Sequence, residues 1–202
     1  MALRAIIFDA GGVLVRTIDQ APRRKWEQAL GMAPGEAERI VFGAETGYAV
    51  QLGLVSEAAH WRWVQERLGL ADAALADFRR DFFSQDRVDA GLLAYLARLR
   101  GRFHLGLLSN ASADARRQFS EDHHLAGYFD SLTISGEEGV MKPDARIFEI
   151  ALARAGALPA EAAFVDDTPV NVEAAARLGL HAIRFVDPAS AQAELSALSG
   201  VK

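Results

Sequence analysis

Five short apolar runs along the chain each stop at a turn or a polar residue, and this pattern predicts five buried strands. The runs cover residues 4–8, 103–108, 131–135, 162–165 and 181–186. Between them, residues 112–123, 144–155 and 169–178 show the apolar spacing of amphipathic helices. Strands that alternate with helices are typical of an α/β protein, so we expect a doubly wound parallel sheet.

Residues 16–87 interrupt this alternation, because they show helical spacing and no strand pattern. The helices expected there cover residues 19–30, 34–48, 56–68 and 72–83. We therefore predict a core built from residues 1–15 and 88–202, with residues 16–87 inserted as a small helical cap. The alternative is that these helices form a layer of the core itself.

The composition is that of a globular protein of 202 residues, enough for one core domain with a small appendage. The formal net charge of −5 argues against a nucleic-acid-binding protein. The absence of cysteine excludes disulfides, zinc–thiolate sites and thiol nucleophiles, and it favours a cytoplasmic location. We find no apolar run approaching the roughly 20 residues of a membrane span and no signal-peptide pattern. The oligomeric state is left open.

Polar residues stand where the predicted strands end. Asp9 follows the first strand, Ser109 the second and Asp166-Asp167 the fourth, while Lys142 lies in the loop after the third. The carboxyl ends of parallel strands share one edge of the sheet, where α/β proteins bind their ligands. We therefore expect these residues to converge on one site.

The charges of these residues indicate magnesium-dependent chemistry on a phosphate. A carboxylate nucleophile such as Asp9 repels a phosphate dianion unless a cation lies between them. The neighbouring carboxylates of Asp166 and Asp167 also need a cation, and Mg²⁺ prefers such oxygen ligands. Lys142 can neutralise the phosphate, and Ser109 can donate a hydrogen bond to it. Taken singly, each feature also fits a turn or a helix cap, but their joint order favours catalysis.

Four segments resemble the motifs of haloacid-dehalogenase-like hydrolases. They are IIFDAGGVL at 6–14, LLSN at 107–110, GVMKPD at 139–144 and FVDDTPVN at 164–171. The resemblance runs along the whole chain in order, and the helical insert stands where that family carries a small type I cap. It implies a Rossmann-like core and a hydrolase that removes phosphate from a small phosphorylated molecule, such as a sugar phosphate.

The resemblance also implies roles for single residues. Asp9 would attack phosphorus and form an aspartyl phosphate, while Ser109, Asn110 and Lys142 would hold the phosphate group. The implied ligands of Mg²⁺ are Asp9, the carbonyl of Gly11, Asp167 and Asp166, the last directly or through water. The cap would open for substrate and close to exclude water.

One position departs from the family pattern, because Gly11 stands where most of its phosphatases carry a second aspartate. That aspartate acts as general acid and base, a contribution of about 10²–10⁴-fold. We consider three consequences: a preference for good leaving groups such as anomeric or acyl phosphates, replacement by a residue such as Asp19 or His60, or weakened activity.

Two rival functions remain open. A 2-haloacid dehalogenase would resemble this chain in its nucleophile, but Asp166-Asp167 would repel its anionic substrate in the absence of a cation. A phosphate-binding protein without catalysis is the other rival, and Gly11 is its support. Most of the aromatic residues of the insert, among them Trp26, Trp61, Trp63 and Phe42, are interpreted as packing, with the lining of a substrate pocket as the alternative. The basic run 23–25 is interpreted as solvated charge, with one arginine as a candidate for binding a second substrate anion.

Overall fold

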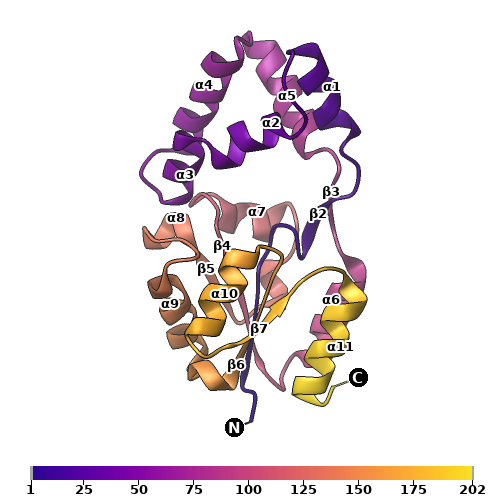
Figure 1. The fold of residues 1–202 in the computed structure, drawn as a ribbon, viewed down its shortest axis with the longest axis vertical. Helices are drawn as coiled ribbons and strands as arrows, with labels where there is room; N and C mark the ends of the chain where they lie inside the picture. The colour runs from indigo at the N-terminus through magenta and orange to yellow at the C-terminus, as the bar shows by residue number, and fades with distance from the viewer. Residues whose placement is uncertain (1, 202) are drawn as a thin grey trace.

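The computed structural model describes residues 2–201, which form two parts stacked along the longest axis of the molecule (Figure 1). One part is built around a five-stranded sheet with the order β5-β4-β1-β6-β7, and every neighbouring pair of strands is parallel. Its strands are β1 (Ala5–Phe8), β4 (His104–Ser109), β5 (Ser131–Ile134), β6 (Ala162–Asp166) and β7 (His181–Arg184). All five predicted strands are present, and the predicted fold class is confirmed.

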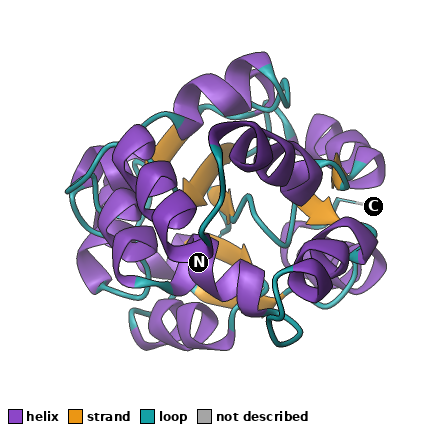
Figure 2. Ribbon diagram, turned by 90° about the horizontal axis from the view of Figure 1, so that it is seen from above, coloured by secondary structure: helices purple, strands orange, loops and turns teal. Residues whose placement is uncertain are grey.

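The sheet is covered by helices on both faces, as Figures 1 and 2 show. Ile6 and Phe8 of β1 pack into one hydrophobic cluster, whereas Ala5 and Ile7 pack into the other. Successive strand residues point to opposite faces, so a strand buried on both sides is apolar throughout. The first cluster is closed by α6 (Ala90–Leu99), α7 (Ala115–Glu121) and α11 (Pro188–Ser199), and the second by α9 (Ala145–Ala155) and α10 (Pro169–Arg177).

Three short elements complete the loops of this part. They are η2 (Ala126–Tyr128), α8 (Ser135–Glu138) and η3 (Pro159–Glu161). Within residues 2–201, no helix combines the length and the apolar character that crossing a membrane requires.

The other part is helical and has its own core. Its elements are α1 (Ala21–Ala29), α2 (Glu36–Glu38), η1 (Arg39–Gly43), α3 (Glu45–Gln51), α4 (Glu57–Leu68) and α5 (Asp72–Phe83). A cluster that includes Trp61, Val64, Phe78 and Phe82 holds these helices together. Ser56 begins α4 as expected, since its hydroxyl accepts a hydrogen bond from Ala59 N (3.1 Å).

A two-stranded ribbon joins the two parts, and it corrects the expectation that residues 16–87 contain no strand. β2 (Val15–Thr17) pairs with β3 (Asp86–Val88) in an antiparallel arrangement. Each strand has three residues, too few to show an alternating pattern. The ribbon forms because two distant passages of the chain meet, and Thr17 Oγ1 also donates to Asp86 Oδ1 (2.6 Å).

Candidate active site

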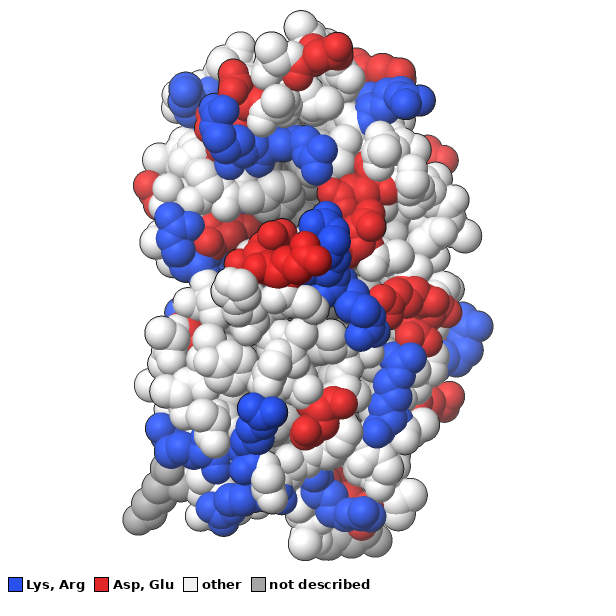
Figure 3. Space-filling view, turned by 180° about the vertical axis from the view of Figure 1, so that it is seen from behind, with Lys and Arg blue, Asp and Glu red and all other residues white. Residues whose placement is uncertain are grey.

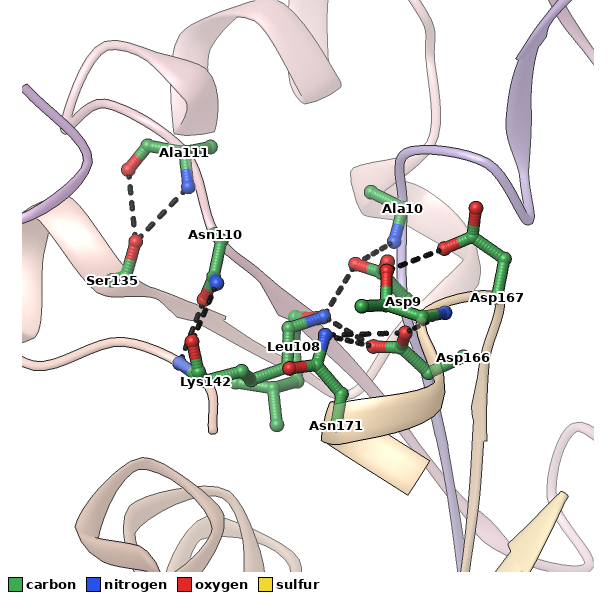
Figure 4. Close-up of polar contacts among 11 residues, drawn as sticks. Asp9, Ala10, Leu108, Asn110, Ala111, Ser135, Lys142, Asp166, Asp167 and Asn171 are labelled. Carbon is green, nitrogen blue, oxygen red and sulfur yellow. Dashed lines mark hydrogen bonds and ion pairs between the residues drawn. The ribbon is translucent and has the colours of Figure 1, made fainter. Parts of the chain in front are cut away.

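Polar side chains gather at one edge of the sheet because three neighbouring strands end there (Figure 4). Asp9 directly follows β1, Ser109 is the last residue of β4, and Asp166 is the last residue of β6. Since β1 lies between β4 and β6, its end places Asp9 between the other two strand ends. The structure thus brings these residues together from positions more than 150 residues apart in the chain.

Lys142 stands at the centre of this group. Its ammonium nitrogen lies 2.7 Å from Asp9 Oδ1 and 2.7 Å from Asp166 Oδ2, and it donates a hydrogen bond to Leu108 O (3.0 Å). The lysine side chain is almost fully buried, so its charge is compensated by these acceptors rather than by water. One ammonium group therefore links the ends of β1, β4 and β6.

The side chain of Asn110 holds Lys142 in place through hydrogen bonds to the backbone of the lysine. The side-chain Nδ2 of Asn110 donates to Lys142 O (2.9 Å), and Lys142 N donates to Asn110 Oδ1 (2.8 Å). Both ends of the Asn110 amide are engaged in this way. The Asn110 side chain therefore positions Lys142. The backbone of Asn110 remains available to contact a ligand.

Asp166 accepts hydrogen bonds on both carboxylate oxygens. Oδ1 accepts from Thr168 N (2.7 Å), Oδ2 accepts from Lys142 Nζ (2.7 Å), and Asn171 Nδ2 lies 3.1–3.2 Å from both oxygens. Asp166 is fully buried, and it does not line the cavity described below. Asp167, by contrast, is half-buried and lines that cavity.

Burial, together with the neighbouring charges, shifts the pKa values of this group. Burial raises the pKa of Asp9 from 3.8 to about 7, although Lys142 acts in the opposite direction. Burial and the carboxylate of Asp166 also raise the pKa of Asp167. For Lys142, burial alone would lower the pKa, but the carboxylates of Asp9 and Asp166 raise it overall. The group contains three carboxylates and one ammonium group, so a further cation would neutralise its excess negative charge.

The donor set fits a hard metal ion. Asp9, Asp166 and Asp167 each offer a carboxylate oxygen, and these oxygens lie within 4.8 Å of one another. Mg²⁺ is bound through one or two carboxylates together with water and substrate oxygens. Asp9 and Asp167 have the more accessible carboxylates, because that of Asp166 is enclosed by its hydrogen-bond partners.

A tight turn after β1 shapes this site. Gly12 has a φ of +77°, and a Cβ added there would lie 2.2 Å from Asp167 Oδ2. Only glycine can hold this conformation at so close an approach. A Cβ added at Gly11, by contrast, meets nothing within 4 Å. Gly11 lines the cavity, so the position of the missing second aspartate is open and solvent-facing.

A cavity of about 750 Å³ lies above the strand ends, between the two parts. All the predicted site residues except Asp166 line this cavity, and all of them belong to the core. They are Asp9, Gly11, Ser109, Asn110, Lys142 and Asp167. The lining residues from the helical part and the ribbon are Val15, Arg16, Thr17, Gln20, Arg23, Glu38, Phe42, Tyr48, Gln51 and Asp86. The cavity is therefore closed by both parts of the chain.

Neither residue considered as a replacement for the second aspartate lines this cavity. Asp19 Oδ1 accepts a hydrogen bond from Ala21 N (2.8 Å) at the start of α1. His60 lines a smaller second cavity of about 140 Å³, which shares lining residues with the first, and its Nδ1 lies 3.0 Å from Thr46 Oγ1. Both side chains thus serve local structure.

Two contributions to the site were not predicted from the sequence. Asn171, which orients Asp166, stands five residues after it on the first turns of α10. Arg23 is buried and paired with Asp86 and Glu38, so its interpretation as solvated charge is wrong. Its guanidinium stacks on the ring of Phe82 at 4.1 Å, a contact between residues far apart in the sequence.

The sequence matches the family model described as haloacid dehalogenase-like hydrolase over residues 3–179. The phosphoserine phosphatase of Thermus thermophilus is 33% identical over 171 residues, which cover 81% of this chain and 68% of that protein. The D-ribitol-5-phosphate phosphatase of Bacteroides thetaiotaomicron is 28% identical over 207 residues, or 97% of this chain and 98% of that protein. A match to mouse acyl-CoA dehydrogenase family member 10 is shorter, with 46% identity over 72 residues, 36% of this chain and 7% of that protein.

Among solved structures, a haloacid dehalogenase family enzyme from Bacteroides thetaiotaomicron superposes with a TM-score of 0.76. It is 20% identical, and the superposition covers 93% of this chain and 96% of that one. That structure is a complex with magnesium and inorganic phosphate. At this level of identity the likeness shows a shared fold.

Proposed function

Because this chain belongs to the haloacid dehalogenase-like hydrolases and is a hydrolase, we propose that it is a Mg²⁺-dependent phosphohydrolase acting on a small phosphorylated metabolite. The observation that carries the proposal is the group of three carboxylates, two of them buried, and one buried ammonium at the strand ends. Such a group attracts a divalent cation, and a divalent cation with Lys142 attracts a phosphate dianion. The phosphatase relatives and the neighbour with bound magnesium and phosphate support this choice.

We propose that Asp9, Asp167 and the carbonyl of Gly11 hold Mg²⁺, and that Asp166 assists them from its buried position behind the cavity wall. The bound ion would neutralise charge on the phosphate and on the nucleophile. The hydrogen bonds that Asp166 accepts from Asn171 and Thr168 keep its carboxylate directed at Lys142. Its contribution is therefore to fix the position of the lysine.

The residues of the chain divide the chemical step among them. Asp9 Oδ1 is held by Lys142 Nζ (2.7 Å) and Ala10 N (2.8 Å), which leaves Oδ2 free to attack phosphorus in line. The bond from phosphorus to the leaving oxygen then breaks, the leaving oxygen takes a proton from water, and an aspartyl phosphate forms on Asp9. Ser109, the backbone of Asn110 and Lys142 hold the transferring group. Water then attacks the same phosphorus and releases phosphate, which restores the carboxylate.

The wall of the cavity supports a division of labour between the two parts. We propose that residues 1–15 and 88–202 carry the chemistry and that residues 16–87 act as a cap that selects the substrate. Ser135 Oγ of the core donates to Gln51 O of the helical part (2.6 Å), so the two parts are in contact in this structure. A cavity of this size suits a small metabolite. A cytoplasmic location completes the proposal.

The test is phosphate release from aryl, anomeric, acyl and alkyl phosphates, in Mg²⁺ and in EDTA, by the wild type and Asp9→Asn. Release that requires Mg²⁺ and is lost in Asp9→Asn is the expected result. Release that persists in EDTA, or in Asp9→Asn, would contradict the proposal. Chloride release from a 2-haloacid without Mg²⁺ would instead identify a dehalogenase.

A further inference from the structure

The cap side of the cavity contains an ion cluster around the buried side chain of Arg23. Its Nε donates to Phe82 O (2.9 Å), and its Nη2 donates to Thr17 Oγ1 (2.8 Å) and to Asp86 Oδ1 (3.2 Å). Its Nη1 lies 3.5 Å from Glu38 Oε1. Nε and Nη2 therefore have hydrogen-bond acceptors, and Nη1 has an ion-pair partner. Arg23 lines the cavity, as does Arg16, but the charge of Arg23 is already compensated there.

The other two basic residues of the cavity wall also have carboxylate partners, although the buried Nε of Arg16 has no hydrogen-bond partner in the part of the chain that the structure describes. Arg16 forms an ion pair with Asp89, which also caps α6 by accepting from Leu92 N (2.8 Å). Lys142 is bound by Asp9 and Asp166. Among residues 2–201, the cavity wall thus offers four acidic and three basic side chains, and each basic one has a carboxylate partner. Figure 3 shows the same mixture on the surface, with acidic and basic side chains adjacent where the two parts meet.

This charge pattern determines which other chemical groups a substrate can carry beside its phosphate. A second acid group on the substrate would find each basic side chain of the wall already paired with a carboxylate, and beside Arg23 it would approach the carboxylates of Glu38 and Asp86. Burying an unpaired charge is costly, and like charges repel. Hydroxyl groups, by contrast, can donate hydrogen bonds to those carboxylates. We propose that the Glu38–Arg23–Asp86 cluster is a specificity determinant, which selects phosphate esters of hydroxylated alcohols that carry no second acid group.

Glu38 is the component of the cluster that can be changed without disturbing the fold. Its side chain is 51% exposed, whereas that of Arg23 is 5% exposed. Replacing Glu38 with glutamine removes one compensating charge, so that Arg23 Nη1 becomes available to a substrate carboxylate. Glu36 lies on the same short helix and does not line the cavity, so Glu36→Gln changes the net charge equally without touching Arg23.

This inference rests on the proposed phosphatase function, and the experiment separates the two. The substrates are glycerol 3-phosphate and 3-phosphoglycerate, which differ in a terminal hydroxymethyl or carboxylate group, with 4-nitrophenyl phosphate as a general substrate. For the wild type we expect kcat/KM for glycerol 3-phosphate to exceed that for 3-phosphoglycerate by about tenfold or more, the worth of one charge-assisted hydrogen bond. In Glu38→Gln the ratio should fall roughly fivefold or more, and in Glu36→Gln it should not change.

Inhibition of 4-nitrophenyl phosphate hydrolysis by both esters provides a second readout that does not require their turnover. Glycerol 3-phosphate should again bind more tightly than 3-phosphoglycerate. A wild type that prefers 3-phosphoglycerate, a ratio that Glu38→Gln leaves unchanged, or a site that neither ester enters would overturn the inference. A wild type that fails to hydrolyse even 4-nitrophenyl phosphate would contradict the proposed function instead.

Discussion

The backbone of Gly12 lies against the carboxylate of Asp167, so that a Cβ at Gly12 would come within 2.2 Å of Oδ2 and 2.5 Å of Cγ. The contact joins the turn after β1 to the loop after β6. The carboxylate of Asp167 thus lies against the turn that follows Asp9, and oxygens of the two carboxylates lie within 4.8 Å of each other. The turn is therefore part of the proposed metal site as well as a connection between strands.

Gly12→Ala should damage both stability and activity. The new Cβ must displace Asp167, and the residue must keep a positive φ that alanine disfavours. We expect a loss of about 1–3 kcal/mol in the free energy of unfolding and most of the Mg²⁺-dependent activity. Urea unfolding and phosphate release measure the two effects. Gly11→Ala is the matched control, since its Cβ meets no atom within 4 Å; equal losses in both variants would refute the steric argument.

Gly11→Asp should restore a general acid at an open position. The side chain has space, and Gly11 lines the cavity above Asp9. We expect kcat for alkyl phosphates to rise on the order of tenfold or more, because their leaving oxygens need a proton. Hydrolysis of 4-nitrophenyl phosphate, whose leaving group needs little protonation, should change much less. A uniform change across both substrates would argue against a role in proton transfer.

Lys142→Met should destabilise the protein by leaving buried carboxylates without their counter-ion. Removing one partner of a buried ion pair costs about 3–5 kcal/mol. The loss should be larger at pH 8 than at pH 5, because Asp9 can take up a proton at the lower pH. Denaturant unfolding in EDTA at both pH values provides the measurement. The exposed Lys25→Met is the control and should stay within about 0.5 kcal/mol of the wild type.

The raised pKa of Asp9 predicts how stability depends on pH. Between its ordinary pKa of 3.8 and about 7, the folded protein holds a proton on Asp9 that the unfolded chain has released. This stabilising contribution is fully present below pH 3.8 and is lost as the pH rises through 7.

In Asp9→Asn the side chain at position 9 is uncharged at every pH, so the stability of this variant should not fall as the pH rises through 7. A pKa change of that size corresponds to about 4 kcal/mol at most. In EDTA, the free energy of unfolding of the variant should increase relative to that of the wild type as the pH rises from 4 to 8. The two values should be similar near pH 4. Urea unfolding across this range tests the expectation. A difference in stability that is the same at pH 4 and pH 8 would show that Asp9 does not titrate as described.

Much of the core could be predicted because its strands are apolar on both faces and stop at polar residues. That pattern placed Asp9, Ser109 and Asp166 at strand ends, and the parallel arrangement then brought them together. The contact of Lys142 with both Asp9 and Asp166 follows from the loop after β5, whose course no local pattern specifies.

The features that sequence reasoning missed depend on pairings between distant segments. β2 and β3 are three residues each and exist because they meet. Arg23 is buried only because Phe82, Thr17 and Asp86 surround it, and a run of three basic residues gives no sign of this. Charge in a sequence indicates exposure on average, and tertiary partners override that average.

The central position of β1 in the sheet has a consequence for how the protein folds. β1 pairs with β4 and β6, whose residues follow it by about 100 and about 160 positions in the chain. Pairings over such separations lose more chain entropy before they gain contacts, so they form slowly. Until β6 is available, the apolar segment Ala5–Phe8 has at least one unpaired edge and can associate with other chains. The strand that leads to the proposed nucleophile thus depends on distant parts of the chain being synthesised before both of its edges are paired.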